Sequence, residues 1–284
     1  MSALKQRFKG FFPNWFIVVR NYRRAHGAVP NLIAPRTFNE KVVHRILFDR
    51  RPLLTQMQDK VAVRSYVESR LGSSILPKLY HLTNRPETIP FEKLPEKFVV
   101  KPTHGSGWVQ IVFNTPALDR NAIIEISSGW LKRSWYKEVR EWPYKDIEPR
   151  VMVQEFVDDG SGTTPNDYKV FVFGGQAEMI QVDTTRFTDH RRRLFTPLWQ
   201  KLDVLLQYDD ICGDVPQPPH LGEMIVAAET LGKDLDFIRV DFYDTAAGLY
   251  FGEITTIPEG GLGRFDPEAF DRYLGGRWVL PRRV

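Results

Sequence analysis

The chain contains 284 residues, of which 42% are hydrophobic and 26% charged, a composition that suits a globular protein with one large domain or two closely packed ones. A disordered chain, a repeat array and a disulfide-stapled miniprotein are excluded. The single cysteine, Cys212, cannot form an internal disulfide, and no cluster of Cys and His residues suggests a zinc site. We therefore expect a protein of a reducing compartment, the cytoplasm.

The N-terminal region is basic and aromatic. Residues 1–30 carry six Lys or Arg and no acidic residue, whereas the net charge of the whole chain is only +4. Because a nucleic-acid-binding protein would spread its bases over a folded face, we expect no nucleic-acid partner. The apolar run of residues 11–19 is too short to cross a membrane, and it has no cleavage site typical of a signal peptide.

Two interpretations of this N-terminal segment remain open. In the first, it makes weak peripheral contact with the inner face of an anionic membrane through its bases and the aromatic residues Phe11, Phe12, Trp15 and Phe16. In the second, it forms a helix that packs these aromatic side chains on the core and leaves its arginines in solvent.

Helical patterns occur in four further places. Thr37 and Glu40 form a capping-box pattern that begins a helix over residues 37–50. Helices are also expected over residues 58–70, 117–138 and 220–232.

Strand patterns occur mainly after residue 97. Residues 98–101 and 108–113 predict two short strands joined by a loop, and residues 150–157 predict a buried strand. Residues 167–173 and 177–184 predict a hairpin around a Gly-Gly turn, and residues 237–243 and 249–255 predict another. Since helices and strands do not alternate regularly, an α+β arrangement is favoured over a doubly wound sheet.

The last predicted hairpin contains a candidate metal site. Strand alternation places Arg239 and Asp241 on one face, and Glu253 shares that face if it pairs with Asp241. Like charges directly opposite destabilise a hairpin by about 0.2–1 kcal/mol, so a cation is expected between them. Mg²⁺ would suit two carboxylates with Thr255 two residues further on. Alternatively, Arg239 or a distant lysine neutralises the two acids.

A glycine-rich loop follows the strand that ends at Lys101. Its residues Gly105, Ser106 and Gly107 could fold over a polyphosphate, with backbone N–H groups and the lysine as donors, or could simply form a hairpin loop. The loop matches neither the Walker A pattern nor the dinucleotide fingerprint.

In combination, these features resemble the ATP-grasp superfamily, and most closely its branch similar to TupA, named for teichuronopeptide synthesis. The resemblance covers most of the chain and is carried by residues 35–41, 59–60, 63–67, 94–101, 104–107, 167–169, 239–243 and 251–255. It implies an α+β ATP-grasp fold, in which two subdomains grip ATP between them, with a helical N-terminal region. The implied division is an N-terminal region of residues 1–95, a small subdomain with the phosphate loop at 96–157, and a C-terminal subdomain with the metal site at 158–284.

The resemblance also implies roles for individual residues. Lys60 and Lys101 would hold the α- and β-phosphates of ATP, and Lys169 would reach the γ-phosphate. Adenine would bind the backbone of Glu155 and Val157, next to Gln154. The loop residues His104, Gly105, Ser106 and Gly107 would contribute to nucleotide binding, although His104 could instead cap the turn. Asp241 and Glu253 would ligate Mg²⁺, with Thr255 at the place where many relatives have Asn.

Three other features lie outside this nucleotide set. Arg186 stands where similar ligases place a basic group near an acyl phosphate. The run Arg191, Arg192 and Arg193 is interpreted as a solvated loop, where an anionic substrate could also dock. The glycines at 260, 261 and 263 are interpreted either as a flexible loop near the acceptor or as a plain surface loop.

The function implied is an ATP-dependent carboxylate–amine ligase that acts through an acyl phosphate, with Lys101, Lys169 and Arg186 as catalytic residues. Its expected partners are a small-molecule or glycan carboxylate and an amine acceptor, in cell-surface polysaccharide or glycopeptide synthesis. Two alternatives stay open. One is a kinase on the same scaffold that phosphorylates a sugar or another hydroxyl, and the other is a non-catalytic nucleotide-binding subunit of a surface-glycan assembly.

Overall fold

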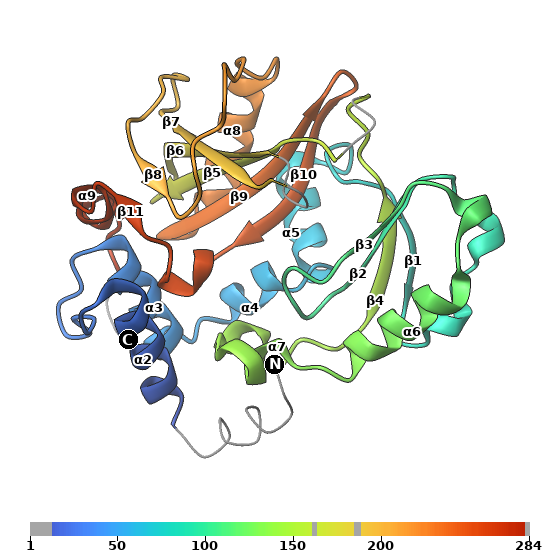
Figure 1. The fold of residues 1–284 in the computed structure, drawn as a ribbon, viewed down its shortest axis with the longest axis horizontal. Coiled ribbons are helices and arrows are strands. Elements are labelled where there is room, and N and C mark those ends of the chain that lie inside the picture. The colour runs from blue at the N-terminus through green and yellow to red at the C-terminus, as the bar shows by residue number, and fades with distance from the viewer. Residues whose placement is uncertain (1–12, 161–163, 185–188, 282–284) are drawn as a thin grey trace. The chain divides into compact units, whose positions relative to one another are not determined.

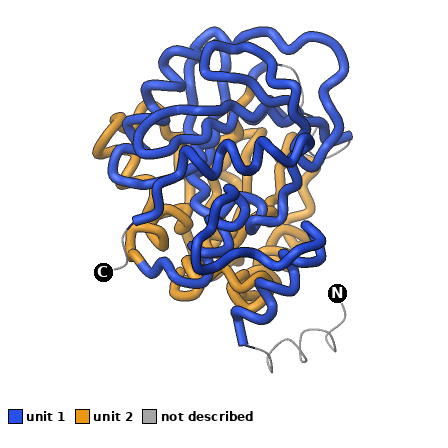
Figure 2. Tube along the Cα trace, turned by 90° about the vertical axis from the view of Figure 1, so that its left-hand side faces the viewer, with its two compact units in different colours: residues 1–50, 159–284 blue, residues 51–158 orange. Residues whose placement is uncertain are grey.

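The computed structural model describes residues 13–160, 164–184 and 189–281. The chain forms two compact units, one of residues 1–50 and 159–284 and the other of residues 51–158 (Figure 2). The three-part division expected from the resemblance stays a prediction. Both units combine helices with antiparallel sheet (Figure 1), which confirms the expected α+β class.

The unit of residues 51–158 is built on a four-stranded antiparallel sheet in the order β1-β4-β2-β3. Alternate residues of the central strands, such as Phe98, Val100, Val151 and Val153, form a core with Trp130 of helix α6. The strands are β1 (Leu79–Thr83), β2 (Phe98–Pro102), β3 (Gln110–Val112) and β4 (Val151–Glu155). The helices are α4 (Pro52–Gln58), α5 (Ala62–Leu71), α6 (Arg120–Leu131) and α7 (Trp135–Val139).

Two of the predicted helices are interrupted. The helix expected over residues 58–70 starts only at Ala62, because the carboxylate of Asp59 accepts hydrogen bonds from the N–H groups of Val61 and Ala62 and so begins a new helix. The stretch expected over residues 117–138 divides into α6 and α7, since Ser134 caps the second helix by accepting from the N–H of Lys137.

The other unit is built on a five-stranded antiparallel sheet in the order β10-β9-β5-β6-β7. The strands are β5 (Asp167–Phe173), β6 (Gln176–Thr184), β7 (Arg191–Phe195), β9 (Phe237–Thr245) and β10 (Gly248–Thr255), and a small pair is formed by β8 (Leu205–Leu206) and β11 (Phe265–Asp266). Helices α2 (Asn14–His26), α3 (Phe38–Phe48), α8 (Leu221–Gly232) and α9 (Ala269–Arg277) accompany the sheet. Both predicted hairpins are present, and the turn at Gly174 and Gly175 uses positive φ at both residues.

One face of this sheet packs against helix α8, where Gly232 lies so close to Val172 that a Cβ would come within 2.5 Å of its side chain. The opposite face is apolar at one end. There, Phe171 and Phe237 pack around Phe38 at the start of α3, a helix that begins with the predicted capping box of Thr37 and Glu40. The same face becomes polar two residues further along each strand, and this polar end holds the candidate site.

Two loop interpretations are wrong. Arg192 and Arg193 do not lie in a solvated loop: they belong to strand β7 and are only 3% and 9% exposed, because buried carboxylates and carbonyls receive their guanidinium groups. The glycine segment around Gly261 is not a surface loop either. Gly261 is buried with φ +73°, and a Cβ there would lie 2.9 Å from the carbonyl oxygen of Asn39.

Helix α2 agrees only in part with the second interpretation of the N-terminal segment, a helix that packs its aromatic side chains on the core. It buries Ile17, Val18 and Tyr22, but Trp15 and Phe16 are 56% and 36% exposed instead of packing on the core. Phe11 and Phe12 lie outside the described residues. Within the residues that the structure describes, no helix has the length and apolarity required to span a bilayer.

Candidate functional site

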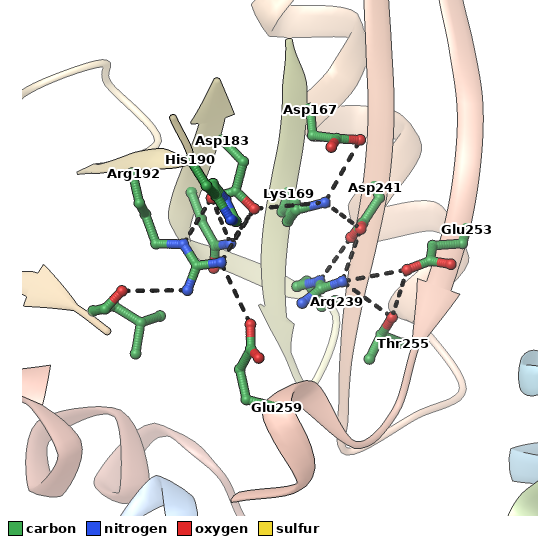
Figure 3. Close-up of polar contacts among 12 residues, drawn as sticks. Asp167, Lys169, Asp183, His190, Arg192, Arg239, Asp241, Glu253, Thr255 and Glu259 are labelled. Atoms are coloured by element: carbon green, nitrogen blue, oxygen red, sulfur yellow. Dashed lines mark hydrogen bonds and ion pairs between the residues drawn. The ribbon is translucent and has the colours of Figure 1, made fainter. Parts of the chain in front are cut away.

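A row of charged side chains crosses all five strands of the larger sheet (Figure 3). In strand order the row contains Glu253, Asp241, Lys169, Asp183 and Arg192. Asp241 lies opposite both Glu253 and Lys169 in the sheet register, and Asp183 lies opposite Arg192. Positive and negative groups therefore meet at the polar end of one sheet face.

The expected pairing of Asp241 with Glu253 is confirmed by the register of β9 and β10. A bulge between Phe251 and Glu253 accompanies it. Gly252 lies at this bulge, and a Cβ there would come 3.0 Å from the carbonyl oxygen of Asp241. The glycine thus allows the two carboxylates to share a face.

The cation between these two carboxylates is Arg239, as one of the two alternatives from the sequence proposed. Its Nε donates to Asp241 Oδ1 at 2.7 Å. Its Nη2 is surrounded by three oxygens: Asp241 Oδ2 at 2.8 Å, Glu253 Oε1 at 3.4 Å and Thr255 Oγ1 at 3.2 Å. The three residues predicted to ligate Mg²⁺ therefore converge on one positively charged group.

This oxygen set fits the chemistry of a hard divalent cation, which prefers carboxylate and hydroxyl oxygens together with water. Asp241, Glu253 and Thr255 supply two carboxylates and one hydroxyl within reach of a single point. In the part of the chain that the structure describes, no group of three or more His, Cys, Asp or Glu side chains could hold a metal ion. A cation here would thus depend on this pair of acids, Thr255 and non-protein ligands.

Lys169 is surrounded by carboxylates. Its Nζ donates to Asp241 Oδ2 at 2.7 Å and lies 3.6 Å from Asp167 Oδ1 and 4.0 Å from Asp183 Oδ2. The side chain is only 3% exposed. Arg239 also pairs with Asp241 and Arg192 with Asp183, so three cations balance these three acids. Glu253 adds a further negative charge that a metal ion could neutralise.

Asp183 is held by its strand neighbours. Arg192 donates from Nε and Nη2 to the two carboxylate oxygens at 2.7 and 3.2 Å, and Gln181 Nε2 donates to the same oxygens at 3.1 and 2.9 Å. Burial acts to raise the pKa of Asp183, but Arg192, together with the charges of Lys169 and His190, lowers it well below its usual range. Asp183 is therefore an anion with both oxygens engaged.

The buried pair of Arg239 and Asp241 responds to opposing influences. Burial raises the pKa of Asp241, although the charges of Arg239 and Lys169 oppose this rise. Burial acts to lower the pKa of Arg239, but Asp241, Glu253 and Glu259 reverse that effect and raise it. Arg239 consequently stays charged. Each additional positive charge nearby stabilises the ionised form of Asp241, the carboxylate that Arg239 binds.

The smaller unit holds the predicted phosphate loop. Lys60 Nζ donates to the carbonyl oxygen of Gly105, so the lysine is tied to the loop itself. Gly105 packs under Trp108, where a Cβ would come within 2.7 Å of the indole ring, and Gly107 has φ +71°. Both glycines are thus required by the path of the loop. Lys101 lies at the root of this loop in β2, and Ser106 lies within the loop, half-buried.

His104 anchors this loop to helix α6. Its side chain is buried, and Nε2 lies 3.1 Å from the carbonyl oxygen of Trp130, which requires a proton on this nitrogen for a hydrogen bond. Burial lowers the pKa of His104, so the ring favours its neutral form. This geometry supports the capping role that the sequence left open beside nucleotide contact.

The predicted adenine segment ends strand β4. The backbone N–H of Glu155 donates to the carbonyl oxygen of Lys78 at 2.8 Å, and the Glu155 carboxylate accepts from the N–H of Lys78 at 2.8 Å. Gln154 and Val157 are buried. Adenine recognition by Glu155 and Val157 stays a prediction.

The catalytic role of Arg186 also stays a prediction, since this residue lies outside the described residues. Sequence reasoning missed the partnership of Asp183 with Arg192 and the position of Asp167 beside Lys169. A signal for them existed, because polar residues two apart in otherwise apolar strands mark one shared face. The pairs are Asp167 with Lys169, Gln181 with Asp183, and Arg239 with Asp241.

Several solved structures share features of this fold. The chain is similar to D-alanine–D-alanine ligase from Bacillus anthracis complexed with ATP, at 18% identity over 72% of this chain and 56% of that chain, with a TM-score of 0.45. It is similar to L-amino acid ligase from Bacillus licheniformis at 14% identity over 87% of this chain and 55% of that chain, with a TM-score of 0.49. It is also similar to the ATP-grasp ligase PsnB complexed with minimal precursor, at 14% identity over 81% of this chain and 59% of that chain, with a TM-score of 0.42. The chain thus spans less than two thirds of the length of each of these proteins.

No curated protein matches the sequence significantly. The model of the TupA-like ATP-grasp family, in contrast, matches residues 40–279, which include every candidate site residue named above. The chain belongs to the TupA-like ATP-grasp family.

Proposed function

We propose that the protein is an ATP-dependent carboxylate–amine ligase. ATP would phosphorylate a substrate carboxylate, and an amine would then attack the acyl phosphate to give an amide, ADP and phosphate. The observation that carries this proposal is the charged row in which Lys169 binds Asp241 and Asp241 pairs with Glu253 on the next strand, in a chain of the ATP-grasp family. A lysine for a phosphate next to two carboxylates for a metal is the combination that phosphoryl transfer requires.

Each predicted residue has a task in this reaction. Lys60 and Lys101, with the backbone of the Gly105 to Gly107 loop, would bind the α- and β-phosphates, and Lys169 would bind the γ-phosphate. Asp241, Glu253 and Thr255 would hold Mg²⁺, which supplies neutralising charge for the triphosphate when bound. Arg186 would stabilise the oxyanion of the acyl phosphate. Adenine would bind at Glu155 and Val157.

The state of Asp183 argues against this residue as the base that a kinase would need. A hydroxyl acceptor needs a carboxylate or histidine that accepts its proton, whereas a carboxylate substrate is already ionised near neutral pH. Asp183 is the buried acid nearest to Lys169 apart from Asp241 and Asp167, but both of its oxygens are engaged by Arg192 and Gln181. Asp183 itself is therefore poorly suited to accept a proton from a hydroxyl. Because the neighbouring His190 could accept one, the choice between ligase and kinase depends on the product test below.

The substrate class is proposed from the family resemblance. A sugar or amino-acid carboxylate and an amine, in cell-surface polysaccharide or glycopeptide synthesis at the cytoplasmic side of the membrane, would suit it. Weak peripheral contact of the N-terminal region with that membrane is supported by the exposed Trp15 and Phe16 on helix α2, near the exposed Arg23 and Arg24.

The product distribution tests this function. The full chain is incubated with ATP, Mg²⁺, a mixture of amino acids and uronic acids, and hydroxylamine, which traps acyl phosphates as hydroxamates. A ligase yields ADP, phosphate and a hydroxamate. A kinase yields ADP and a stable phosphorylated product without hydroxamate or free phosphate, and a non-catalytic subunit binds the nucleotide without turnover.

A further inference from the structure

His190 lies next to the buried anion of the charged row. It directly precedes strand β7, and its Nε2 is 3.5 Å from Asp183 Oδ1. Nε2 is buried and has no hydrogen-bond partner among the residues that the structure describes, while the side chain as a whole remains 20% exposed. One edge of the imidazole thus faces the Asp183 carboxylate (Figure 3), and part of the side chain is exposed to solvent.

The position of this ring is fixed by Tyr208. The two ring centroids are 3.9 Å apart with an interplanar angle of 33°. The guanidinium of Arg192 lies over the same tyrosine, 4.7 Å from its centroid. Tyr208 therefore holds both the histidine and the arginine that keeps Asp183 ionised.

The charged groups around His190 come from four elements. Asp183 of β6 faces it directly, and Arg192 of β7 and Lys169 of β5 contact that carboxylate. Glu259 of the short helix Pro258–Gly261 lies 3.4 Å from Arg192. A proton that arrives on the imidazole would thus be stabilised by an anion that is already in place, without reorganisation.

The proposed ligase needs such a group. An amine acceptor is mainly an ammonium ion at neutral pH, and its nitrogen has no lone pair for attack until a proton leaves. A histidine is the side chain best suited to accept a proton at this pH, particularly when a carboxylate orients it.

We propose that His190, oriented by Asp183, is the general base that activates the amine acceptor. This inference rests on the proposed ligase function. The ammonium proton moves to His190 Nδ1, and the amine lone pair forms a bond to the acyl carbon. The bond between that carbon and the phosphate oxygen breaks, and phosphate leaves with the electron pair and takes up the second proton that the attacking nitrogen must lose to give a neutral amide. The imidazolium, paired with Asp183, then returns its proton to solvent.

Hydroxylamine separates this role from a structural one, because it is a weak base that is largely uncharged at neutral pH and needs no general base. We compare wild type with His190→Gln in the presence of ATP, Mg²⁺ and the mixture of amino acids and uronic acids. Phosphate release without hydroxylamine reports attack by the amines of the mixture, and hydroxamate formation reports the acyl phosphate. In His190→Gln, amine-dependent release should fall about 100-fold, the lower end of what general base catalysis contributes, while hydroxamate formation stays within about twofold.

A matched control is His220→Gln. His220 also pairs with an aspartate, since its Nδ1 lies 2.5 Å from Asp244 Oδ1, but it belongs to the start of helix α8, and strand alternation places Asp244 on the face of β9 opposite to Asp241. This variant should change neither rate.

As a second measurement, the residual amine-dependent rate of His190→Gln should rise about tenfold per pH unit through neutral pH, because only amine that is already deprotonated then reacts.

Three results would contradict the proposal. Equal loss of both rates in His190→Gln would indicate a structural or phosphoryl-transfer role, and equal retention of both would show that the imidazole is not needed. If wild type forms no hydroxamate and no phosphate, the ligase function fails, and the general base fails with it. Retained hydroxamate formation shows that the variant is folded, so misfolding cannot imitate the expected result.

Discussion

Lys169 Nζ donates a hydrogen bond to Asp241 Oδ2 at 2.7 Å, so the residue proposed for the γ-phosphate and a residue proposed for the metal are bonded to each other. Both side chains are 3% exposed. Asp241 must therefore share its charge among Lys169, Arg239 and any metal ion. A metal at this position would weaken the hold of Asp241 on Lys169, which couples metal binding to the availability of the lysine for phosphate.

This arrangement makes the two predicted metal ligands unequal in their effect on stability. Asp241→Asn should lower the free energy of unfolding by about 3–5 kcal/mol, because the buried Arg239 and Lys169 lose their shared anion. Glu253→Gln should lower it by about 0–1 kcal/mol, since the Glu253 side chain is 37% exposed and its oxygen is 3.4 Å from Arg239. Urea denaturation measures both values.

Both variants should nevertheless abolish Mg²⁺-dependent phosphate release. Near-normal turnover in either one at ordinary Mg²⁺ concentration would refute the metal assignment. If both variants lowered the free energy of unfolding by the same amount, Asp241 and Glu253 would contribute equally to stability, contrary to what their distances from Arg239 indicate.

From the sequence, the helices and strands that carry this site were predicted better than the contacts between their side chains. Capping and turn signals, such as Thr37 with Glu40 and the Gly-Gly pair at 174, are local, and they produced the correct helix α3 and the β5–β6 hairpin. The pairing of Asp241 with Glu253 was only a condition of the metal-site hypothesis. The short turn alone would place Asp241 opposite Gly252, and the bulge between Phe251 and Glu253 shifts the register by one residue. The interruption before α5 was missed because Asp59 was read as part of a helix, whereas its side chain caps the next one.

The burial of Arg192 could not be predicted in the same way. Three consecutive arginines ordinarily indicate a solvated segment, and only the sheet register shows that Asp183 lies opposite the middle one. Strand β7 is recruited by long-range pairing with β6, which no local pattern encodes. The identity of the cation between Asp241 and Glu253 was likewise left open, because it depends on side-chain geometry.

The pH dependence of stability should report the Asp183 pair. The folded-state pKa of Asp183 is lowered below the value of about 3.9 that an unfolded aspartate has, so its ionisation stabilises the fold above that pH and this contribution is lost as the pH falls below it. The difference in unfolding free energy between wild type and Asp183→Asn should therefore be largest near neutral pH and shrink in acid. Urea unfolding at a series of pH values measures it, and a difference that stays constant down to about pH 2 would contradict the assignment.

The basic face of helix α2 predicts salt-sensitive vesicle binding. Replacing the exposed Arg23 and Arg24 together by Glu should weaken flotation with phosphatidylglycerol vesicles by tenfold or more, since each base near an anionic surface contributes about 1 kcal/mol. The matched control replaces Lys93 and Lys132 by Glu. Both lysines are also exposed, and the net charge changes by the same amount. If both double variants lose binding to the same extent, net charge and not helix α2 determines the association. Wild type that fails to float at low salt removes the membrane proposal.

The glycine loop allows the phosphate-binding assignment to be tested without knowledge of the substrate. In Gly105→Ala the new methyl group would lie within 2.7 Å of the Trp108 ring, so either the loop or the indole must shift, and the carbonyl that receives Lys60 shifts with it. We expect Mg-ADP affinity, measured by calorimetry, to fall at least tenfold. Gly129→Ala is the matched control, because it lies in helix α6, has no neighbour within 4 Å of the added methyl group and gains helix propensity of about 1 kcal/mol. Unchanged ADP affinity in Gly105→Ala, with Lys101→Ala also binding normally, would mean that this loop does not hold the phosphates. If only Gly105→Ala loses ADP affinity, the loop backbone and Lys60 bind the phosphates. If both variants lose affinity, the loop and Lys101 bind them together.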